Sequence, residues 1–130
     1  MKNLKAAMTT VIAVWVLTMS SAWAQGLTNQ QSNAVRSAQL YLSIQGFSRS
    51  GLIGQLSSEY GDGYSVRDAT VAVDSLNVDW NRQAVKSARL YLSISGFSCR
   101  GLIEQLSSSY GDGYTQAEAT YGARQAGACD

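Results

Sequence analysis

One segment occurs twice in this sequence, and the repetition limits what the chain can fold into. The stretch LYLSIQGFSRSGLIGQLSSEYGDGY, residues 40–64, returns 50 residues later as LYLSISGFSCRGLIEQLSSSYGDGY, residues 90–114. When residues 34–76 are aligned with residues 84–126, 26 of the 43 positions are identical. Repetition at this level indicates that each copy forms the same small unit. Because such a unit is close to the lower size limit of a domain, we expect the two units to bury a shared surface.

Each copy has the pattern of three short helices. Apolar residues recur at helical spacing, and a side chain that can cap a helix precedes each run. The predicted caps are Thr28, with Gln31 completing a capping box, then Ser48, Ser65, Asp79, Ser98 and Thr115. No proline and no alternating strand pattern interrupts these segments. We therefore predict an all-α fold of two tandem three-helix, helix-turn-helix-like repeats.

Glycines follow the first and second helices of each copy. We expect Gly46 and Gly96 to end the first helix in the left-handed conformation that glycine tolerates. The Gly-Asp-Gly loops at residues 61–63 and 111–113 follow the second helix. One carboxylate per loop is far below what a calcium site requires, so we interpret both loops as turns.

The first 24 residues have the three-part pattern of a secretory signal peptide. Lys2 and Lys5 precede an apolar run over residues 11–19, and Ala-Trp-Ala then ends at Ala24, which predicts cleavage before Gln25. An uncleaved membrane anchor is the alternative, but nine apolar residues fall short of the roughly 20 that span a bilayer. No later run is long enough to span, so we expect the mature chain to be soluble and exported, in the periplasm or secreted.

The two units are predicted to occupy residues 25–77 and 78–130, joined without a flexible linker. Trp80, the only tryptophan after residue 24, lies at this junction together with Val78. We expect both side chains to fill the seam between the units. Alternatively, Trp80 is exposed and contributes to a binding surface, because tryptophan is enriched at such sites.

The two copies differ where an arginine is replaced by a cysteine. Cys99 aligns with Arg49, and Cys129 aligns with Asp79. We expect a Cys99–Cys129 disulfide to replace an Arg49–Asp79 ion pair and to fasten the last helix, which has no following repeat to pack on. The alternative is two free or intermolecularly bonded cysteines.

Several kinds of chemistry lack the residues that they need. The chain contains no histidine, its acids have the pattern of caps and turns, and two cysteines alone make no usual metal set. Removal of Lys2 and Lys5 from ten basic residues leaves eight against nine acidic ones, a net charge near −1. We therefore expect no enzyme activity, no cofactor, no metal and no nucleic-acid partner.

The motifs YLSI-x-GFS and GLI-x-QL, followed by AVDSLNVDWN and a second copy, resemble the Ltp family of host cell surface-exposed lipoproteins. The resemblance covers nearly all of the chain after residue 24. It implies small exported proteins with tandem helix-turn-helix repeats that act in phage superinfection exclusion. In that role, a prophage-encoded protein outside the cytoplasmic membrane blocks injection of phage DNA by engaging the phage tape measure protein. A lipid-attachment cysteine at the cleavage point is missing here, so we expect no lipid anchor.

The surface that both repeats present in common is the predicted partner-binding site. It comprises exposed positions around Arg36 and Lys86 and the twin loops that end in Tyr64 and Tyr114. For Tyr60 and Tyr110, which continue the apolar stripe of the second helix, a place in the core is favoured. The rival functional hypothesis is a structural or interaction protein of the bacterial cell envelope unrelated to phage.

Overall fold

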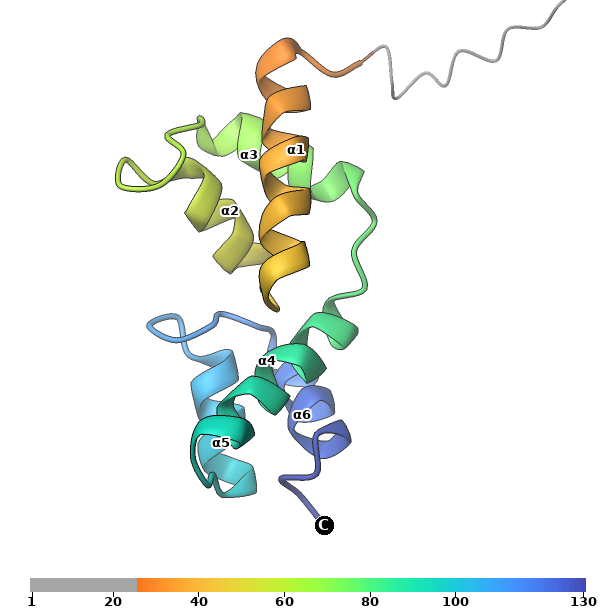
Figure 1. Cartoon of the computed structure of the whole chain (residues 1–130), viewed down its shortest axis with the longest axis vertical. Coiled ribbons are helices and arrows are strands. Elements are labelled where there is room, and N and C mark those ends of the chain that lie inside the picture. The colour runs from red at the N-terminus through yellow and green to blue at the C-terminus, as the bar shows by residue number, and fades with distance from the viewer. Residues whose placement is uncertain (1–25) are drawn as a thin grey trace, which may run out of the picture.

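The computed structural model describes residues 26–130, which form six helices and no strand (Figure 1). The first unit contains α1 (Asn29–Ile44), α2 (Arg49–Ser57) and α3 (Val66–Ser75). The second unit contains α4 (Trp80–Ile94), α5 (Cys99–Ser107) and α6 (Gln116–Gln125). The predicted all-α fold with three helices in each repeat is confirmed. The predicted signal peptide and its cleavage site at Ala24 and Gln25 lie outside the described residues.

The predicted caps stand at the start of all six helices. Thr28 accepts a hydrogen bond from the Gln31 backbone N–H at 3.1 Å, and the Gln31 side chain accepts one from the Thr28 N–H. Thr115 and Glu118 form the same reciprocal box, and Ser48, Ser65, Asp79 and Ser98 each accept from a backbone N–H three residues on. These side chains satisfy N–H groups that the helix itself leaves free, which fixes where each helix begins.

Each unit has its own hydrophobic core. In the first, Ala38 of α1 meets Leu52 and Leu56 of α2 and Ala69 and Val73 of α3, and all five are fully buried. The second core repeats this with Ala88, Leu102, Leu106, Ala119 and Ala123, and adds Ala84 and Tyr114. Small residues on the first and third helices allow their backbones to approach closely: a Cβ built on Gly122 of α6 would lie 2.7 Å from a backbone atom of Ala84 in α4.

Trp80 joins the two units. It is the first residue of α4, yet its half-buried side chain packs against the core of the first unit. The structure agrees with the prediction for Trp80, whereas Val78, which was predicted to fill the seam with it, is half-buried and belongs to neither core. Among the described residues the cores otherwise stay separate, so the shared surface that the short repeats were expected to bury is small.

Gly46 and Gly96 do not end their helices in the left-handed conformation, and that prediction is wrong. Neither has a positive φ, and the capping residues Gln45 and Ser95 are extended. Gly46 is needed for a close approach instead, because a Cβ there would lie 2.6 Å from Ser87 Oγ and 2.7 Å from the Gln83 carbonyl oxygen. At Gly96 the same space is empty.

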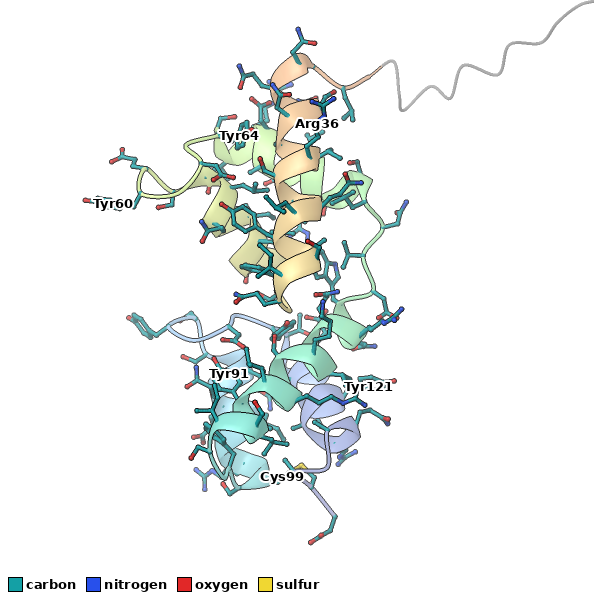
Figure 2. All side chains as sticks on the ribbon, in the orientation of Figure 1. Arg36, Tyr60, Tyr64, Tyr91, Cys99 and Tyr121 are labelled. Atoms are coloured by element: carbon teal, nitrogen blue, oxygen red, sulfur yellow. A yellow bond between two sulfur atoms is a disulfide. The ribbon has the colours of Figure 1, made fainter. Side chains whose placement is uncertain are left out.

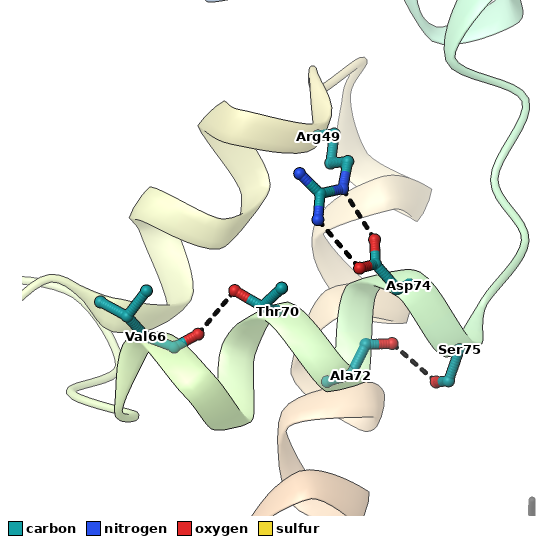
Figure 3. Close-up of polar contacts among 6 residues, drawn as sticks. All are labelled: Arg49, Val66, Thr70, Ala72, Asp74 and Ser75. Atoms are coloured by element: carbon teal, nitrogen blue, oxygen red, sulfur yellow. Dashed lines mark hydrogen bonds and ion pairs between the residues drawn. The ribbon is translucent and has the colours of Figure 1, made fainter.

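The predicted disulfide is present, but the predicted ion pair has a different acid. Cys99, at the start of α5, is bonded to Cys129 beyond α6, with the Cα atoms 4.8 Å apart. Arg49 pairs with Asp74, not Asp79: Nε and one terminal nitrogen donate to the two carboxylate oxygens at 2.7 and 2.8 Å (Figure 3). The Arg49 guanidinium accordingly lowers the pKa of Asp74. Asp79 is not free to pair in this way because it caps α4.

The second unit lacks both features that close the end of the first. Position 124, which aligns with Asp74, is an arginine, and position 130, which aligns with Trp80, is an aspartate. The tail after α6 takes their place, with Ala126, Ala128 and Cys129 packed against the second core. The disulfide therefore holds this tail where the first unit uses an ion pair and a tryptophan.

We predict that replacing both cysteines, Cys99→Ser with Cys129→Ser, lowers the free energy of unfolding by about 3 to 4 kcal/mol, because a loop of about 30 residues is no longer closed in the unfolded chain. Arg49→Gln with Asp74→Asn is the matched change in the first unit. It should cost at most about 1 kcal/mol, since that pair is half-exposed. Urea unfolding of oxidised protein measures both, and equal midpoints for the two double variants would contradict the assignment.

We predict that Gly46→Ala destabilises the protein by about 1 to 3 kcal/mol, because the new methyl group meets the backbone of α4. Gly96→Ala is its counterpart in the second unit and should change stability by no more than about 0.5 kcal/mol. Thermal unfolding of the two variants under one condition tests the difference. A loss of similar size in both would show that Gly46 is not required for contact between the units.

Candidate functional site

Two loops of the same construction connect the second and third helices of the units. In the first, the N–H groups of Gly61 and Gly63 donate to the Ser58 carbonyl, both at 3.0 Å, and the Tyr64 N–H donates to Leu56 at 2.9 Å. The second loop, residues 108–114, repeats these bonds at the same distances. Gly63 and Gly113 have φ angles of 70° and 72°, a conformation that glycine tolerates best. Both loops are therefore fixed by the backbone, as the prediction of turns implied.

A carboxylate ties each loop to the first helix of its unit. Tyr41 donates to Asp62 at 2.8 Å, and Tyr91 donates to Asp112 at 2.6 Å. These hydrogen bonds contribute to raising the pKa of both tyrosines, as the main cause for Tyr41 and after burial for Tyr91. No cluster of three potential metal ligands occurs within residues 26–130. Both acids thus act as anchors of a turn.

The exposure of the loop tyrosines is the reverse of the prediction. Tyr60, at the tip of the first loop in Figure 2, is fully exposed, and so is Tyr110. The reason is that α2 and α5 end at Ser57 and Ser107, before the apolar stripe reaches the tyrosines. Tyr114 is only 3% exposed and shares a 2.7 Å hydrogen bond with Ser87, so the prediction that its ring binds a partner is wrong. Tyr64, half-buried near Ser37, packs against the first core in the same way.

Both loops extend toward the same side of the molecule in the view of Figure 1. Their tips therefore present two identical Tyr-Gly-Asp-Gly turns on one side, one from each repeat. A fully exposed aromatic side chain on a loop held by backbone hydrogen bonds loses little conformational freedom when it binds. The twin tips have the properties of a recognition surface.

Arg36 and Lys86 occupy equivalent helix positions but have different surroundings. Arg36 lies on the exposed face of α1 (Figure 2). Lys86 is also exposed, but its ammonium donates to the Leu42 carbonyl at the end of α1, 3.0 Å away. Lys86 therefore helps to hold the two units together, and the surface around the two cations is not the same in both repeats.

A cleft of about 320 Å³ lies between the units. Residues from the end of α1 and the start of α2 form one side, and Leu90, Tyr91 and Ile94 of α4 form the other, with Asp112 at the second loop. The loop is held there because Ser48 donates to the Asp112 carbonyl and Ser50 donates to the Gly113 carbonyl at 2.8 Å. Burial raises the pKa of the Asp112 carboxyl above its usual range, against the opposing effect of the Tyr91 hydrogen bond.

Sequence reasoning missed this cleft. Its apolar wall was visible as the exposed-face pair Leu90 and Ile94, four residues apart, but the same pair occurs as Leu40 and Ile44 in the first copy. Only the packing of one unit on the other distinguishes them.

None of the helices within the described residues has the length and apolar character of a membrane span.

Comparison with known proteins agrees with this architecture. No curated protein sequence gives a significant match. A solved structure does match: Ltp, a superinfection exclusion protein from the Streptococcus thermophilus temperate phage TP-J34, with 32% sequence identity and a TM-score of 0.67. The alignment covers 75% of this chain and 96% of that one. The sequence profile of the host cell surface-exposed lipoproteins matches twice, over residues 29–76 and 79–124, which are the two helical repeats. The chain belongs to this Ltp family of host cell surface-exposed lipoproteins.

Proposed function

We propose that this protein is an exported, non-enzymatic binding protein that excludes superinfecting phage by blocking the entry of phage DNA. The partner would be a phage tail protein, namely the tape measure protein, met outside the cytoplasmic membrane. Membership of the Ltp family and the similarity to a phage superinfection exclusion protein support this role. The predicted export signal, with cleavage before Gln25, is consistent with it.

The observation that carries the proposal furthest is the pair of exposed tyrosines, Tyr60 and Tyr110. Nothing in their own units requires them, since both side chains are fully exposed while the surrounding loops are held by backbone bonds. Large aromatic side chains on the surface are frequent centres of protein interfaces. Two of them in a tandem repeat offer two linked contacts with one partner, which strengthens binding without requiring either contact to be strong alone.

We predict that cells expressing the intact chain adsorb a sensitive phage normally but do not take up its DNA. Cells expressing the chain without residues 1–24 should take up the DNA, because the protein then stays in the cytoplasm. Adsorption and DNA entry are scored separately on a panel of phages. Unchanged entry across the whole panel would favour the rival role, a cell-envelope protein unrelated to phage.

We predict that Tyr60→Ala and Tyr110→Ala each weaken exclusion, and that the double variant abolishes it, because removal of a central aromatic contact typically costs about 2 kcal/mol or more. Tyr121→Ala is the control, since Tyr121 is 44% exposed but lies on α6, away from the loops. The efficiency of plating measures the effect. Exclusion that is intact in the double variant but reduced by Tyr121→Ala would place the contact elsewhere.

A further inference from the structure

We propose that the cleft between the two units binds one helical segment of a partner protein, with two aliphatic side chains one turn apart followed by a lysine or arginine. The aliphatic side chains would pack on Leu90 and Ile94 of α4, and the cation would reach the carboxylate of Asp112. This inference rests on the proposed function, in which the partner is a phage protein, and it specifies the chemistry of the segment that is recognised.

The apolar wall of the cleft is exposed without an evident structural reason. Leu90 is 50% exposed and Ile94 is 74% exposed, and both lie on the same face of α4, four residues apart. The rings of Phe47 and Tyr91 also line the cleft, and each is held by an edge-on contact with a neighbouring ring. Side chains spaced four residues apart form a ridge that fits the groove of another helix. A helical partner with its own aliphatic pair therefore matches this wall.

The carboxylate of Asp112, at the polar end of the cleft, is suited to bind a cation. Asp112 accepts a hydrogen bond from Tyr91 but, within residues 26–130, is not part of any ion pair. Its carboxyl is half-buried because the first unit packs over the loop, whereas Asp62 in the first loop is exposed. A carboxylate that has lost part of its water without gaining a cation is stabilised when an ammonium or guanidinium group reaches it. Charge complementarity thus specifies lysine or arginine.

The cleft exists only because the units are paired. Two close approaches bring the first unit onto the second: Gly46 lies against Ser87, and a Cβ on Gly51 would be 3.2 Å from the Asp112 carbonyl oxygen. At Gly96, the equivalent of Gly46 in the second unit, the space around a Cβ is empty. A single repeat would therefore have the aliphatic pair and the loop acid but no cleft between them.

The size of the cleft limits what can enter it. A volume of about 320 Å³ is at the lower end of ligand pockets, enough for a few side chains and too small for a folded domain. The partner helix is therefore expected to lie across the opening and to insert side chains from one face. Tyr110 lies two residues from Asp112, so a partner in the cleft is also close to one loop tip.

The direct test uses synthetic peptides with the full mature protein. The probe is a fluorescein-labelled 16-residue alanine-based helix with two leucines four residues apart and a lysine one turn later. One control replaces the lysine by glutamate, and another replaces both leucines by serine. Fluorescence anisotropy should detect saturable binding of the lysine peptide, weakened about tenfold or more in each control. No saturable binding, or equal binding of all three peptides, would overturn the inference.

Matched protein variants locate the binding site. Ile94→Ser and Asp112→Asn should each weaken the lysine peptide about tenfold, because one removes buried apolar area and the other removes the charge. Ile44→Ser and Asp62→Asn make the same changes at the equivalent positions of the first unit and should leave the affinity unchanged. Equal losses in the two sets would overturn the assignment to the cleft. Circular dichroism and urea midpoints check that all four variants fold, and Leu90→Ser replaces Ile94→Ser if that variant does not.

Self-association is the competing occupant, because α1 itself presents an aliphatic pair and a cation at spacings of four residues, in the reverse order: Arg36, Leu40 and Ile44. Light scattering of the protein without peptide decides this. A monomer up to about 100 μM supports a different partner protein, whereas a dimer that Ile94→Ser dissociates would overturn the inference in favour of a second copy.

Phage exclusion by the same variants separates this inference from the proposed function. Loss of both peptide binding and exclusion in Ile94→Ser and Asp112→Asn supports the two together. Exclusion that survives the loss of peptide binding overturns the cleft as the phage contact and leaves the proposed function intact. If the unaltered protein excludes no phage, the proposed function fails and the cleft is not a phage contact, whatever the peptides show.

Discussion

The arrangement of the two repeats depends on the contact between the start of α2 and the second loop. The hydroxyl groups of Ser48 and Ser50 donate to successive backbone carbonyls, those of Asp112 and Gly113. The Ser48 hydroxyl oxygen also caps α2, because it accepts a hydrogen bond from the Gly51 N–H. Little apolar surface is buried between the units, since each unit has its own core. Trp80 is the principal side chain that packs from one unit onto the core of the other. Directional hydrogen bonds and the absence of a side chain at Gly46 therefore set the orientation of the units.

Two nearly identical sequences have been adapted to two different positions. In the first unit, Arg49 and Asp74 close the end of the bundle, and Trp80 arrives from the next helix to cover the core. In the second unit, the disulfide from Cys99 to Cys129 holds the tail after α6 in place. An exposed ion pair contributes little, whereas a disulfide that closes a loop of about 30 residues contributes several kcal/mol. The cysteine pair thus takes the place in the second unit that the ion pair and the tryptophan have in the first.

Helix starts could be predicted from the sequence, whereas most contacts between the units could not, with Trp80 as the exception. Helix starts follow from side chains such as Thr28 and Asp79, whose hydrogen bonds are local. The apolar periodicity predicted a second helix that reaches Tyr60, which has the right spacing, but α2 ends at Ser57. Gly46 and Gly96 have the same sequence context, and only the neighbouring α4 makes the first a close approach. The sequence did not predict the cleft for the same reason. Both copies contain the aliphatic pair and the loop acid, but only those of the second unit face another unit.

The covalent bond lies in the unit that supplies most of the cleft. Leu90, Ile94 and Asp112 belong to the second unit, and the loop that carries Asp112 runs between α5 and α6, the two helices that Cys99 and Cys129 fasten together. The bond lies at the ends of α5 and α6 that are away from the loop, and it closes α5, the loop and α6 into one covalent ring. A site that is held in its binding geometry before the partner arrives spends less of its interaction energy on ordering. We therefore expect the disulfide of the second unit to lower the cost of ordering at the proposed cleft site.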